Sequence, residues 1–103
     1  MKYRVELTPR AEFDLREISS TVLAEAPVRG ALWLDRLERS ILSLSQMPER
    51  CPLERALSSS RREVRKLLFG TRRYRYRVYY TIAAEAVWVL HIRHSSRQRP
   101  KNS

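Results

Sequence analysis

The sequence predicts an α+β domain with the element order β-α-α-β-β-β. Residues 2–7 alternate apolar and polar side chains, which is typical of a half-buried strand. Residues 9–46 carry two apolar stripes at helical spacing, interrupted at Pro27, and these indicate a hairpin of two helices. Residues 63–92 contain three segments rich in β-branched and aromatic side chains, which favour strands. We therefore expect an N-terminal strand and a helical hairpin packed on one face of an antiparallel-rich sheet.

The two helices have recognisable limits. Thr8 and Pro9 predict the start of the first, because threonine is a good N-cap and proline fits the first helical position. Its apolar residues follow at intervals of three or four: Ala11, Leu15, Ile18, Val22 and Ala26. The second is expected over residues 27–46, where Leu34, Leu37, Ile41 and Leu44 repeat in the same way. Two prolines and a serine run predict a loop at 48–62.

The three later strands are expected at residues 63–69, 73–82 and 87–92. In the middle one, three arginines alternate with other side chains and should share one face, roughly 6.6–6.8 Å apart. They are Arg73, Arg75 and Arg77. Since two helices can cover only one face of the sheet, the opposite face should be partly open and hold part of this row.

Length and composition exclude several classes of protein. The chain has 103 residues, enough for one domain, expected at 1–97 with a basic tail at 98–103. A single cysteine, Cys51, excludes an internal disulfide or a multi-thiolate metal site. The sequence has neither a membrane-spanning apolar run nor the apolar core of a signal peptide, so we expect a cytoplasmic protein. It also lacks a glycine-rich phosphate loop, and no cofactor is expected.

The charge is unevenly distributed. The chain holds 21 Lys and Arg against 11 Asp and Glu, for a net charge of +10. The first 60 residues are balanced, whereas residues 61–103 carry 12 basic and 2 acidic residues. Arginine presents a planar fork of donors that fits phosphate, so a polyanionic partner is indicated: nucleic acid or an acidic protein. The alternative, that the charge only maintains solubility, does not explain its confinement to one half.

Candidate functional residues follow from this charge. We expect a target-binding surface of basic and aromatic side chains: Arg73, Arg75, Tyr76, Arg93 and Arg99. His94, where the last strand ends, is the candidate for proton transfer near neutral pH, although a structural role is favoured, in which it hydrogen-bonds and caps or packs against the first helix. His91 falls in the alternating set of Val87 and Val89 and is expected to be structural. Two histidines without neighbouring Cys or carboxylates do not favour a metal site.

Three short motifs carry a family resemblance. They are VRKL at 64–67, YRVYY at 76–80 and VLHIRHSSR at 89–97. With the preceding strand and helical hairpin, they resemble the RelE/ParE superfamily of toxins from bacterial type II toxin–antitoxin modules, over nearly the whole chain. The His-Ser-Ser-Arg ending is closer to the ParE-like, plasmid-stabilisation branch. The resemblance implies growth inhibition and an antitoxin partner, often acidic, that neutralises the toxin.

The resemblance implies two alternative activities. ParE-like members inhibit DNA gyrase and are not nucleases, whereas RelE-like members cut mRNA in the ribosomal A site. By position, the RelE-type catalytic residues match Arg65, Arg77 and Arg97, with His94 as the acid–base candidate. Two departures from the RelE pattern favour the gyrase inhibitor: Glu63 replaces a usual lysine, and no tyrosine follows Arg97. A ribosome-dependent endoribonuclease is the alternative, which leaves open whether the chain is an enzyme. A non-toxic RNA-binding module is a further alternative.

Overall fold

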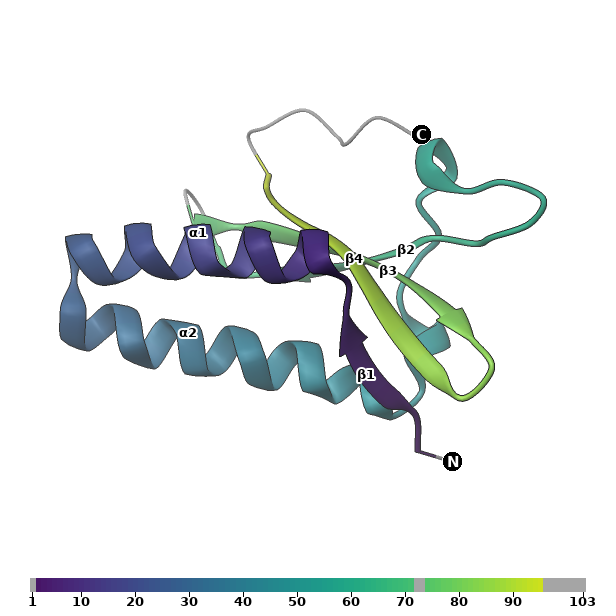
Figure 1. Cartoon of the computed structure of the whole chain (residues 1–103), viewed down its shortest axis with the longest axis horizontal. Helices are drawn as coiled ribbons and strands as arrows, with labels where there is room; N and C mark the ends of the chain where they lie inside the picture. Colours follow the sequence, from purple (N-terminus) through teal and green to yellow (C-terminus); the bar gives the residue numbers. More distant parts are fainter. Residues whose placement is uncertain (1, 72–73, 96–103) are drawn as a thin grey trace.

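The computed structural model describes residues 2–71 and 74–95. It confirms the predicted α+β class and element order (Figure 1). The helices and strands are β1 (Arg4–Leu7), α1 (Pro9–Glu25), α2 (Pro27–Leu42), β2 (Arg65–Phe69), β3 (Tyr76–Ala83) and β4 (Ala86–His94), with 3-10 turns at Ser43–Ser45, Pro48–Arg50 and Arg55–Leu57. None of the described helices is long and apolar enough to cross a membrane.

The four strands form one mixed sheet in the order β1-β4-β3-β2. β1 runs parallel to β4, and the other two pairings are antiparallel. The main core lies between the helical hairpin and one face of this sheet, which we call the helix face. It joins Leu34, Leu37 and Ile41 of α2 to Val78, Tyr80 and Val89 of the sheet, among others.

Thr8 fixes the start of α1 in the way its sequence predicts. Its side-chain oxygen accepts a hydrogen bond from the Ala11 N–H at 3.2 Å, which caps the helix. The same hydroxyl donates to the carbonyl of Val89 at 2.8 Å. The first turn of α1 is thereby attached to β4.

The start of β3 differs from the expectation. The strand begins at Tyr76 rather than at residue 73, because a turn precedes it. The Tyr74 N–H donates to the Thr71 carbonyl at 3.1 Å, and Gly70 adopts a φ of +85°, where an added Cβ would collide with the Tyr74 carbonyl oxygen. Arg75 therefore precedes the strand, and Arg73 lies outside the described residues. The predicted row of arginines on this strand is therefore wrong. Of Arg75 and Arg77, the two members that the structure describes, only Arg77 belongs to β3.

A β-bulge in β4 changes which side chains face the helices. Tyr79 is paired with His91, but the next residue, Tyr80, is paired with Val89, so Leu90 is the extra residue. Val89 and Ile92 both enter the main core, three positions apart. The bulge therefore directs His91 and Arg93 to the opposite face of the sheet. The expectation that His91 continues the set of Val87 and Val89 is wrong for this reason.

Among the described residues, the face away from the helices is only partly covered. A second, smaller core of Leu57, Val64 and Tyr79, with Leu90 against it, packs the 3-10 turn at Arg55–Leu57 onto this face. Leu68 and Trp88, which also belong to it, are 55% and 36% exposed. We call this side the open face.

Candidate target-binding surface

Arg77 and Arg93 lie directly opposite each other on the open face. They are cross-strand partners in the β3–β4 ladder. The Arg77 guanidinium lies 5.9 Å from the centre of the Tyr79 ring, and its Nη2 donates to the carbonyls of His94 and Ser95 at 3.5 and 3.4 Å. Arg77 is thereby held against the end of β4, beside the side chain of Arg93.

His91 completes this group of side chains. It is the cross-strand partner of Tyr79 and lies two residues from Arg93 on the same strand, so both project from the open face. Burial, followed by the positive charge of Arg93, lowers the pKa of His91 below its ordinary value of 6.5. Its imidazole is therefore neutral at pH 7. We call Arg77, Tyr79, His91 and Arg93 the open-face cluster.

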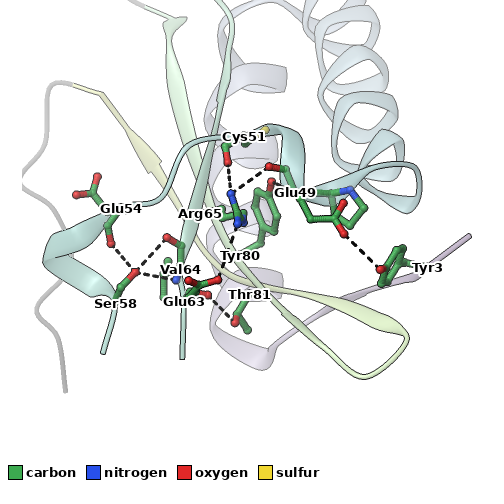
Figure 2. Close-up of polar contacts among 11 residues, drawn as sticks. Tyr3, Glu49, Cys51, Glu54, Ser58, Glu63, Val64, Arg65, Tyr80 and Thr81 are labelled. Atoms are coloured by element: carbon green, nitrogen blue, oxygen red, sulfur yellow. Dashed lines mark hydrogen bonds and ion pairs between the residues drawn. The ribbon is translucent and has the colours of Figure 1, made fainter. Parts of the chain in front are cut away.

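Arg65 is held in a different place. Its Nη1 donates to the carbonyls of Glu49 and Cys51 at 3.0 and 2.7 Å (Figure 2). It is the cross-strand partner of Tyr80, a helix-face residue, whereas Arg77 is the partner of Leu68. The structure therefore separates Arg65 from the open-face cluster, and its guanidinium fastens the segment around residues 49–51 to β2.

Tyr80 supports the same segment from the core. Its hydroxyl donates to the Pro48 carbonyl at 2.6 Å. Burial, followed by a hydrogen bond with the Cys51 thiol, raises the pKa of Tyr80 well above its ordinary value. The phenol stays protonated and acts as a donor across the physiological range, which is a structural role.

His94 lies on the helix face, away from the open-face cluster. Its ring packs edge-on against Tyr76, with centroids 5.0 Å apart, and Tyr76 in turn contacts Trp33 at 5.4 Å. Both line a cavity of about 450 Å³ between α1 and the adjoining ends of β3 and β4, together with Phe13 and Glu17 of α1. The structure thus brings His94 and Tyr76 together but separates them from the side chains of Arg77 and Arg65.

The remaining predicted residues either lie just before a strand or fall outside the described residues. Arg75 is exposed before β3, and its carbonyl accepts a hydrogen bond from the Ser95 N–H at 2.9 Å. Arg73, Arg97, Arg99 and the expected tail at 98–103 lie outside the described residues. Within residues 2–71 and 74–95, no group of three His, Cys, Asp or Glu side chains is arranged to hold a metal ion.

Asp14 is the residue whose importance the sequence analysis missed. It is 6% exposed, and its Oδ2 accepts a hydrogen bond from the Ile92 N–H at 3.0 Å. Its Oδ1 pairs with Arg10 at 3.1 Å. A signal was present, since Asp14 lies three residues after Ala11 and four before Ile18, on the buried stripe of α1.

Comparison with known proteins identifies the family. Residues 5–99 match the family of the ParE toxin of the type II toxin–antitoxin system parDE. The chain belongs to the ParE toxin family. The resemblance to the RelE/ParE superfamily is thereby confirmed. A sequence search of curated proteins gives no match.

Solved structures of toxins and toxin–antitoxin complexes share the fold of this ParE family member. A chain of the chromosomal ParDE system from P. aeruginosa is 15% identical, with a TM-score of 0.70, and the match covers 90% of this chain and 96% of that one. A double mutant of the E. coli toxin RelE in the free state is 18% identical with a TM-score of 0.60, covering 92% and 85%. A chain of the RelBE2 complex from Mycobacterium tuberculosis is 25% identical with a TM-score of 0.56, covering 94% and 95%.

Proposed function

We propose that this ParE family toxin arrests growth by binding and inhibiting DNA gyrase, and that a cognate antitoxin neutralises it. The match of residues 5–99 to the ParE toxin family is the observation that carries the proposal. The ending of the sequence, with serines between His94 and Arg97 and no tyrosine after Arg97, favours the same branch. The toxin then acts as a binding inhibitor rather than as an enzyme.

The positions of the candidate catalytic residues support binding over cleavage. Cleavage of RNA at a ribose 2′-hydroxyl needs a group that takes up a proton, and arginine remains protonated at all physiological pH values. His94, the expected acid–base residue, packs on Tyr76 on the helix face, whereas Arg77 projects from the open face. Arg65 is engaged with two backbone carbonyls. These side chains do not converge on one reacting group.

An acidic antitoxin is the partner that the charge favours. Residues 61–103 carry all of the excess positive charge, and opposite charge accelerates and selects association. The P. aeruginosa ParDE and M. tuberculosis RelBE2 structures are both of toxin–antitoxin systems. We therefore expect the adjoining gene to encode a short protein with an acidic toxin-binding segment.

A ribosome-dependent endoribonuclease is the second candidate, and one specific observation favours it. His91 lies on the same face as Arg77 and Arg93, and its lowered pKa keeps the imidazole neutral and able to accept a proton at pH 7. In this alternative, the two arginines would stabilise charge on a phosphate while His91 moves the proton.

Induction of the toxin in cells that carry a reporter plasmid tests the proposal. We expect growth arrest within one or two generations, together with loss of negative supercoiling in the plasmid, and rescue of both by co-expression of the adjoining gene. Arg77→Glu should weaken both effects, whereas Arg36→Glu, on the exposed surface of α2, should not. Growth arrest with normal plasmid topology and cleaved mRNA would instead establish the endoribonuclease.

A further inference from the structure

Arg77 and Arg93 face each other in the open-face cluster, and Arg93 has no carboxylate partner among the described residues. Arg77 and Arg93 are direct cross-strand partners, and like charges placed opposite each other destabilise a sheet. Arg77 directs its Nη2 to the carbonyls of His94 and Ser95. Within the described residues, no carboxylate lies within ion-pair distance of Arg93. An external anion would offset the repulsion.

The cluster also holds polar atoms that lack a hydrogen-bond partner. His91 Nδ1 and Arg93 Nε are both buried, and neither has a partner among the residues that the structure describes. Buried polar groups in folded proteins are nearly always hydrogen-bonded, so an exception calls for an explanation. Both atoms belong to side chains that β4 directs to the same face, two residues apart. This part of the open face therefore offers no internal hydrogen-bond partner for these two atoms.

The charges around His91 favour a negatively charged ligand. Arg93 on β4 and Arg62 in the segment before β2 both contribute positive charge that lowers the pKa of His91. From α1, across the sheet, Asp14 and Arg10 act on it with opposite signs. Asp14 is already engaged by Arg10 and by the Ile92 N–H, so the balance around the imidazole is positive.

We infer that the open-face cluster binds a phosphodiester group of the DNA backbone, so that the toxin engages DNA held by its target as well as the target protein. The Arg93 guanidinium would donate to the non-bridging oxygens and His91 would donate a further hydrogen bond. Further arginines are exposed before β2 (Arg61 and Arg62) and before β3 (Arg75), and several cations suit a polymer of phosphates better than one isolated anion. The choice of DNA over RNA rests on the proposed function.

Binding of nucleic acid to the purified full-length toxin tests the site. Fluorescence anisotropy is measured with a DNA duplex of about 20 base pairs, an RNA duplex of the same sequence and a glutamate-rich peptide, at low and at physiological salt. We expect the DNA duplex to bind, and Arg93→Gln to reduce its affinity roughly tenfold or more. Arg36→Gln, which removes the same charge from the exposed side of α2, should change affinity less than about twofold. Equal losses in both variants would overturn the inference, because they would show non-specific attraction only.

The His91 imidazole gives a readout that does not depend on any variant. NMR titration of the wild-type toxin should show that the duplex shifts the His91 ring signals and raises the His91 pKa, because a bound anion stabilises the imidazolium. Unchanged His91 signals at saturating duplex would overturn the site. Selective binding of the RNA duplex or of the acidic peptide through Arg93 would overturn the assignment to DNA.

A parallel supercoiling assay separates this inference from the proposed function. If the toxin inhibits gyrase but the duplex binds without Arg93 dependence, the phosphodiester site is wrong and the gyrase target stands. If Arg93-dependent duplex binding is found but the toxin leaves gyrase unaffected, the site stands and the proposed target is wrong. Arg93→Lys, which keeps the charge but loses the planar fork, should bind the duplex with an affinity between wild type and Arg93→Gln.

Discussion

Asp14 is a buried carboxylate that closes the unpaired edge of β4. β1 pairs with β4 only from Ala86 to Val89, so the edge beyond the bulge has no neighbouring strand within the described part of the chain. α1 lies along this edge, and Asp14 supplies the acceptor that Ile92 would otherwise receive from a strand. One side chain thus helps to hold the segment of β4 that carries His91, Arg93 and His94.

Replacement of Asp14 by alanine should therefore be costly. Asp14→Ala leaves the buried Ile92 N–H without a partner, and we expect the free energy of unfolding to fall by about 2–3 kcal/mol. Asp14→Asn keeps an acceptor oxygen while losing the ion pair with Arg10, so it should lose clearly less. Urea unfolding followed by circular dichroism measures both. Equal losses for the two variants would contradict the role of the hydrogen bond to Ile92.

His91 should make stability depend on pH in a defined direction. Burial and Arg93 lower its pKa in the folded state, so the unfolded chain binds a proton more readily than the folded one just below pH 6.5. Stability should therefore fall as the pH drops from about 6.5 through the lower pKa of the folded state. His91→Gln should reduce this slope in thermal unfolding between about pH 7 and pH 5. An identical slope in wild type and variant would show that His91 is not the group responsible.

At the scale of elements, the helical hairpin depends on a close approach between α1 and α2. Gly30 is buried on α2 facing α1, and a Cβ there would lie 2.8 Å from both Cγ1 and the carbonyl oxygen of Val22. A contact of that length forces the two helices apart. The glycine is thus required by packing and not by helix propensity.

Gly30→Ala should reverse the usual ranking of these two residues in a helix. Alanine favours a helix by about 1 kcal/mol over glycine, but overpacking typically costs about 1–3 kcal/mol, so we expect a net loss of stability of about 1 kcal/mol. Ala31→Gly, at the exposed neighbouring position, measures the propensity contribution alone. Thermal unfolding of both variants checks this. A more stable Gly30→Ala protein would show that the hairpin separates at little cost.

Arg65 fastens a loop to the sheet, and its loss should affect stability before it affects target binding. Arg65→Gln removes charge-assisted hydrogen bonds to the carbonyls of Glu49 and Cys51, for an expected loss of about 2 kcal/mol. Binding of the antitoxin and of the target should stay within about twofold of wild type at temperatures where the variant is folded. A stable variant that no longer inhibits its target would instead place Arg65 in the functional surface.

The sequence predicts these elements well where the signal is local. The cap at Thr8, the break at Pro27 and the order of helices and strands along the chain all follow from neighbouring residues. The bulge at Leu90 does not, because residues 87–92 are apolar except for His91 and fit a regular strand equally well, and only the packing of Ile92 reveals the change of face. For the same reason, Arg65 and Arg77 are indistinguishable as strand arginines, although one holds a loop and the other lies in the open-face cluster.

At the scale of the whole molecule, the sheet separates two kinds of surface. The helical hairpin covers the helix face, where His94 packs beside Tyr76. The open face carries Arg77, His91 and Arg93 and is only partly covered by the segment around Leu57. The charge excess of +10 belongs to residues 61–103, and Arg77 and Arg93 are members of this basic segment that lie on the open face. This asymmetry suits a toxin that binds a large anionic target through one side.

A comparison of gyrase and ribosomes with one toxin preparation tests the central claim most directly. Purified toxin is added to a gyrase supercoiling reaction and, separately, to ribosomes stalled on a defined mRNA whose 5′ ends are mapped by primer extension. We predict inhibited supercoiling, relieved by the antitoxin and weakened at least tenfold by Arg77→Glu, with the mRNA intact. A new cut within the A-site codon that is lost in Arg97→Ala, with supercoiling unaffected, would contradict the gyrase account and identify a nuclease.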